Sequence, residues 1–105
     1  MGKNSDMDEL TNLLSLALVH KIGGIVNPDE IYSEKYRKES DAFLKKAVRV
    51  ALRQNWNKED KIRIKEILTS KLRKNLEKRD FLNDKKFELM EDEMINVLGQ
   101  LGLIS

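Results

Sequence analysis

Apolar residues at helical spacing, with few turn-forming residues between them, constrain the fold of this chain more than any other feature. The sequence has one proline and five glycines, and its strand-like alternation is limited to the segment KIRIK at 61–65. The stretches with helical spacing are residues 5–22, 28–54, 58–78 and 85–101. We therefore predict an all-α fold, a single-domain bundle of four helices that are mainly antiparallel.

Size and composition fit one domain over residues 1–105. The absence of cysteine excludes a disulfide framework, a thiolate metal site and a cysteine nucleophile, and it is compatible with the cytoplasm, where we expect the protein. The longest mainly apolar run, LLSLALV at 13–19, is shorter than the roughly 18 residues that a membrane span needs. We expect no membrane contact, and we expect the polar residues 1–4 to be disordered.

The stretch of residues 36–56, most of which belongs to the second predicted helix, has two unequal faces. One face is wide and apolar and predicts a wall of the core, while the other is basic. The apolar face consists of Tyr36, Phe43, Leu44, Ala47, Val48, Val50 and Ala51.

Capping residues predict where the helices begin and end. Gly23 and Gly24 should end the first helix. Asn27 should cap the second, with Pro28 at its first position and Glu30 at the capping-box position. The first helix should be surrounded in its second half, because its apolar residues there cover several sides.

The second and third helices are separated by a short turn at residues 55–57, in which Asn57 caps the third helix. The third helix has a core stripe at Ile64, Leu68, Leu72 and Leu76. So short a connection predicts an antiparallel hairpin of helices two and three.

The last helix has the most regular apolar period in the sequence, and Asp84 is its expected cap. This stripe should lie along a groove between other helices, with Glu88, Glu91, Asp92 and Glu93 off the stripe. Its members are Phe87, Met90, Met94, Val97 and Leu101, with Leu98 beside them.

Residues that could carry catalysis are few. His20 is the single histidine, so it has neither histidine nor cysteine partners for a metal site, and we interpret it as a structural residue, with a pH switch as the alternative. Carboxylate pairs at helix starts are explained by the helix dipole. We expect no enzyme and no cofactor; a carboxylate-bound magnesium or calcium ion is the enzyme alternative.

Basic residues are the nearest approach to a functional signal. From Arg53 to Lys86 there are 12 basic and 6 acidic residues, whereas residues 87–105 hold 4 acidic and no basic ones. Two basic sectors, side by side in the hairpin, could meet successive phosphates of a nucleic acid; the alternative is two solvated helix faces. The candidate residues are Lys38, Lys45, Lys46, Arg49 and Arg53 on the second helix, and Arg63, Lys71, Lys74 and Lys78 on the third.

Two further residues are candidates for an interface. Ile67 lies in the middle of the basic sector of the third helix, where it either packs on another helix or belongs to an exposed contact surface. Trp56 lies in the turn. We expect a non-enzymatic helical interaction protein that binds another protein or itself, as a homo-oligomer. The alternative is a nucleic-acid-binding accessory protein that makes sequence-independent backbone contacts.

Overall fold

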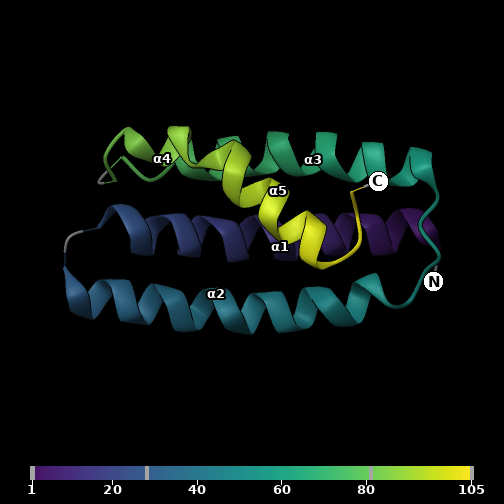
Figure 1. Ribbon diagram of the computed structural model, residues 1–105, viewed down its shortest axis with the longest axis horizontal. Helices are drawn as coiled ribbons and strands as arrows, with labels where there is room; N and C mark the ends of the chain where they lie inside the picture. Colours follow the sequence, from purple (N-terminus) through teal and green to yellow (C-terminus); the bar gives the residue numbers. More distant parts are fainter. Residues whose placement is uncertain (1, 28, 81, 105) are drawn as a thin grey trace.

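Helices alone build the part of the chain that the structure describes, residues 2–27, 29–80 and 82–104 (Figure 1). The predicted all-α fold is confirmed, but the fourth predicted helix is divided in two at Leu89. In this computed structural model the helices are α1 (Lys3–Val26), α2 (Glu30–Ala51), α3 (Lys58–Glu77), α4 (Lys85–Glu88) and α5 (Met90–Gln100).

α1 is the central helix. Figure 1 shows it between α2 and α3, with α5 crossing one face of this three-helix layer. The predicted surrounding of its second half is confirmed, since Leu18, Val19 and Ile22 are each at most 1% exposed. Burial also extends through its first half, where Leu10 and Leu14 have no exposed surface. A helix that is apolar on several sides must find partners on each of them.

The predicted hairpin of α2 and α3 is wrong in its packing. The two helices run in opposite directions (Figure 1), but no Cα atom of one lies within 8 Å of a Cα atom of the other. The physical reason is the number of apolar sides. The buried residues of α2 form one stripe, Ser40, Ala47, Val50 and Ala51, which suits one neighbour. α1 has apolar sides for two neighbours, so it separates α2 from α3, and it runs parallel to α3.

α1 continues through Gly23 and Gly24 to Val26, so the predicted end at the glycine pair is wrong. The glycines instead permit close packing on α2. A Cβ atom at Gly23 would lie 2.8 Å from the ring of Tyr36, and one at Gly24 would lie 3.2 Å from the carbonyl oxygen of Ser33. Ser33 donates a hydrogen bond of 2.7 Å from Oγ to the carbonyl oxygen of Gly24.

The cap of α2 is Asp29, not Asn27. Asp29 Oδ1 accepts from the amide of Ile31 at 2.9 Å, while Asn27 Oδ1 accepts from the amide of Asp29 at 3.0 Å. Asn27 therefore orders the residue that caps the helix. The predicted first residue, Pro28, lies outside the described residues.

The cap of α3 is confirmed. Asn57 Oδ1 accepts from the amide of Asp60 at 2.8 Å, and Asp60 Oδ2 accepts from the amide of Asn57 at 3.0 Å. This reciprocal pair satisfies two backbone donors at the helix start. Asp60 also accepts from Lys3 Nζ at 2.7 Å, so α1 and α3 are joined where both begin. Residues 3 and 4, expected to be disordered, are helical.

The apolar stripe of the last helix is buried as predicted at Met90, Met94, Val97 and Leu98, and it covers α1 and α3. Asp84 precedes α4 but makes no side-chain cap; Asn83 Oδ1 accepts from the amide of Lys85 instead. Lys86 is only 3% exposed, and its ammonium donates to the carbonyl oxygen of Arg79 at 2.8 Å. A cation is favourable there because helix carbonyls lack partners at the C-terminal end of α3.

By length and composition α1 could cross a membrane, unlike the shorter apolar run within it. In this fold 56% of its most apolar 18-residue window is buried inside the protein. The core helix of a globular domain has the same composition. The expected absence of membrane contact stays a prediction.

We predict that Gly23→Ala destabilises the protein, because the new methyl group would overlap the Tyr36 ring. Overpacking costs about 1–3 kcal/mol, which exceeds the gain of up to about 1 kcal/mol in helix propensity. Gly99→Ala is the matched control, since a Cβ atom there meets nothing within 4 Å. Urea unfolding should show opposite signs for the two variants, and a Gly23→Ala variant as stable as the parent would contradict this packing.

Candidate functional site

The nine predicted basic residues lie in two rows, one along α2 that continues to Arg53 just after it, and one along α3 that ends at its C-cap Lys78. Because α1 lies between these helices, the rows are not side by side as the hairpin predicted. Eight of the nine residues are exposed, and Lys71 is half-buried. Their contacts divide them into cations that pair with acidic residues of another helix and cations that have no ion-pair partner of this kind among the described residues.

Arg53, just after the end of α2, is part of a structural ion pair. Its Nη1 atom lies 3.0 Å from Glu9 Oε1 and 3.3 Å from Asp6 Oδ1, both on α1. Gln54 Nε2 donates to Asp6 Oδ2 at 2.7 Å. The hydrogen bond from Gln54, followed by that from Arg53, lowers the pKa of Asp6 although burial opposes this, and Glu9 and Asp6 raise the pKa of Arg53. The carboxylate of Asp6 is thus held ionised at the start of α1.

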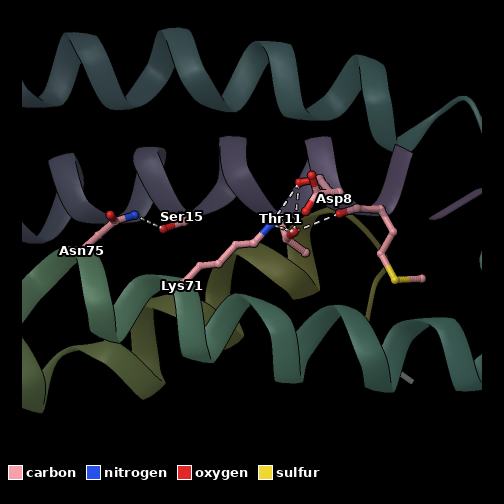
Figure 2. A network of polar contacts seen from close by, with 6 residues as sticks. Asp8, Thr11, Ser15, Lys71 and Asn75 are labelled. Atoms are coloured by element: carbon pink, nitrogen blue, oxygen red, sulfur yellow. Dashed lines mark hydrogen bonds and ion pairs between the residues drawn. The ribbon is translucent and has the colours of Figure 1, made fainter. Parts of the chain in front are cut away.

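Lys71 also has a structural role, because it joins α3 to α1 (Figure 2). Its ammonium donates to Asp8 Oδ1 at 2.9 Å and to Thr11 Oγ1 at 2.8 Å, both on α1. One turn further along α3, Asn75 Nδ2 donates to Ser15 Oγ at 2.6 Å. These contacts form a polar seam between the parallel helices α1 and α3, beside the apolar core.

Lys38 lies 3.5 Å from Glu34 in an exposed pair at i,i+4 spacing, which contributes little to stability. The remaining six predicted cations have no ion-pair partner within 4.0 Å among the described residues. They are Lys45, Lys46 and Arg49 on α2, Arg63 and Lys74 on α3, and Lys78 at the C-cap of α3.

Ile67 and Trp56, the predicted interface residues, are half-buried and pack against the core. The indole nitrogen of Trp56 donates to the carbonyl oxygen of Ala51 at 2.8 Å, near the end of α2. Much of the surface of each side chain is therefore engaged within the fold.

His20 lies between α1 and α2. Its Nδ1 atom is 2.7 Å from the carbonyl oxygen of Leu16, and its Nε2 atom is 2.9 Å from Glu39 Oε2. Its ring packs on Tyr36 and Phe43, with centroids 5.5 and 5.3 Å away. Both ring nitrogens face acceptors, so the ring donates to both only in its doubly protonated form. These contacts support the structural interpretation of His20.

The acidic side of α5 has partners in the same chain. Glu91 lies 3.4 Å from Lys65 on α3, and Glu93 lies 2.9 Å from Lys21 on α1. These pairs bracket the apolar stripe of α5 and fix the helix across the layer. No group of three or more histidine or acidic residues within the described ranges could hold a metal ion.

An apolar groove of about 620 Å³ lies between α3 and the segment after α5. Sequence reasoning missed it, because it forms only when residues 103 and 104 come back beside α3. The available signal was Ile62, an isoleucine off the core stripe, which is 52% exposed; Ile104 on the opposite side is 39% exposed. The groove is lined by Lys61, Ile62, Lys65, Glu66, Thr69, Leu103 and Ile104.

Comparisons with protein-family models, with curated proteins and with solved structures give no match to this chain.

We predict that Lys71→Ala lowers the free energy of unfolding by about 1–2 kcal/mol, because it removes charge-assisted hydrogen bonds to α1. Lys74→Ala is the matched control on the same helix. Since Lys74 is exposed and has no ion-pair partner among the described residues, its removal should change stability by less than about 0.5 kcal/mol. Urea unfolding midpoints measure both, and equal effects would contradict the division into structural and free cations.

Proposed function

We propose that the protein is a non-enzymatic interaction module whose apolar groove binds a protein surface, and that the occupant of the groove is a second copy of this chain. The observation that carries the proposal is the groove itself, where Ile62 and Ile104 are exposed around the buried Leu103. Apolar surface of this kind, rimmed by charged residues, is typical of protein interaction sites.

The charges on the rim favour a second copy. Lys61 and Glu66 lie on α3 with opposite charges, and neither has an ion-pair partner within 4.0 Å among the described residues. In a two-fold arrangement residue i contacts residue j of the other copy, and j contacts i. Lys61 and Glu66 lie on opposite flanks of the Ile62 face, because residues five apart lie about 140° apart around a helix. Two α3 helices packed parallel, with the two-fold axis along them, would therefore pair each Lys61 with the Glu66 of the other copy. The same arrangement would cover both Ile62 side chains.

A binding role accords better with this site than catalysis does. The groove is open to solvent and lined by apolar side chains with lysine and glutamate at the rim. General acid–base catalysis needs titratable groups placed around a shielded substrate position. Of the groove's two lysines, Lys65 is already paired with Glu91.

Light scattering on a size-exclusion column measures the mass of the protein over a roughly hundredfold range of concentration. We predict a dimer that dissociates on dilution. Ile62→Ser should weaken it, whereas Ile31→Ser, at an 81% exposed position on α2 outside the groove, should not. A monomer at every concentration would contradict a second copy as the occupant.

Charge reversal tests the two-fold pairing itself. Lys61→Glu places two carboxylates opposite each other on both flanks of the interface, which should weaken the dimer about tenfold. Adding Glu66→Lys to this variant restores opposite charges and should restore the dimer. If the double variant remains as weak as the single one, the two residues do not pair across a two-fold axis.

A further inference from the structure

The face of the layer opposite α5 carries cations without an ion-pair partner among the described residues, Lys46 and Arg49 from α2 and Lys74 and Lys78 from α3, and it shares no residue with the groove. Helix geometry establishes this face, because residues nine apart lie about 180° apart around a helix. Lys65 contacts Glu91 of α5, and Lys74 follows Lys65 by nine residues. Thr69 contacts Met94 of α5, and Lys78 follows Thr69 by nine residues. Lys74 and Lys78 therefore point away from α5.

The same relation holds on α2. Arg37 lines a pocket together with Val97 and Gln100 of α5, and Lys46 follows Arg37 by nine residues. Lys46 and Arg49 instead line a shallow groove beside α1. The two rows of free cations thus lie on one face of the layer, with α1 between them.

The surface of α1 between the rows does not cancel this charge. Its two acidic residues there, Asp8 and Glu9, are each engaged by a cation of the same chain, Lys71 and Arg53. The exposed Asn12 lies on the same side of α1, and its amide is a neutral hydrogen-bond donor. Two acids of the outer helices lie beside the rows: Glu39, seven residues before Lys46 and in contact with His20, and Glu77, next to Lys78. The four cations Lys46, Arg49, Lys74 and Lys78 outnumber them, so the field along this face is positive.

The spacing of the rows selects the kind of anion. Helices in contact lie 8–10 Å apart, so α2 and α3 on either side of α1 are separated by roughly 16–20 Å. Two cation rows at this separation can each meet a different phosphate backbone, as in a duplex. Stacking of unpaired bases beside the rows is disfavoured, because Trp56 is half-buried with its indole nitrogen bonded to Ala51, and Tyr36 packs on His20. Tyr32 is 52% exposed, but it lies about 21 Å before Lys46 along α2.

We propose that this face binds duplex nucleic acid through its phosphates without reading base sequence. Lys46 and Arg49 contact one strand, and Lys74 and Lys78 contact the other. The proposal is independent of the groove, and a monomer presents the complete face.

Fluorescence anisotropy with a labelled mixed-sequence DNA duplex, titrated over a range of salt concentrations, tests the proposal. The expected result is binding at about 50 mM salt that weakens steeply with added salt. The variant Lys46→Gln, Arg49→Gln, Lys74→Gln, Lys78→Gln should bind at least tenfold more weakly. Its slope of log affinity against log salt should be shallower by about 0.9 for each phosphate that the variant no longer neutralises.

Arg37→Gln, Arg73→Gln is the matched control, because it removes exposed cations of α2 and α3 that lie outside the two rows. For each charge removed, the affinity of this control variant for the duplex should fall by less than half as much as the affinity of the fourfold variant does. The absence of duplex binding at about 50 mM salt would overturn the proposal. An equal decrease in affinity per charge in the control would do the same, as would tighter binding of a single strand than of the duplex.

Discussion

The packing of α1 between α2 and α3 is the constraint on which the rest of the structure depends. A helix with apolar side chains on several sides cannot form the edge of a bundle, because one side would face water. α2 and α3 each offer one buried stripe, and α5 offers a third across the front of the layer. The order of the layer follows from how many apolar sides each helix has, and the short turn between α2 and α3 sets only their direction.

This arrangement also determines what the charged residues do. Because α1 is central, its polar residues at the flanks must be satisfied by its two neighbours, and Arg53 and Lys71 take this role. The cations that remain lie on the outer helices, in two rows separated by the width of α1. The fold thereby separates two candidate surfaces. The apolar groove lies on the side of the layer that α5 covers, between α3 and the segment after α5. The basic face lies on the opposite side of the layer.

Most local signals were read correctly from the sequence, except the exact caps, which lie at Asp29 in place of Asn27 and at Asn83 in place of Asp84. Signals that depend on distant residues were read less well. The cap at Asn57 and the stripe of α5 involve neighbours within a few turns, so spacing alone reveals them. Gly23 and Gly24 have the local pattern of a helix end, but contact with α2 uses them as a packing site inside the helix. The role of Lys71 depends on α1 residues about sixty positions away, and no periodicity records that contact.

The distance between α2 and α3 tests the central position of α1 most directly, and the absence of native cysteine allows spin labels to be attached at single sites. One label pair, Lys46→Cys with Lys74→Cys, spans α1; the reference pair, Asn12→Cys with Lys46→Cys, joins the neighbouring helices α1 and α2. Pulsed electron spin resonance should give a spanning distance longer than the reference by roughly 8–10 Å, one helix separation. Equal distances for the two pairs would mean that α2 packs directly on α3, and would contradict the account.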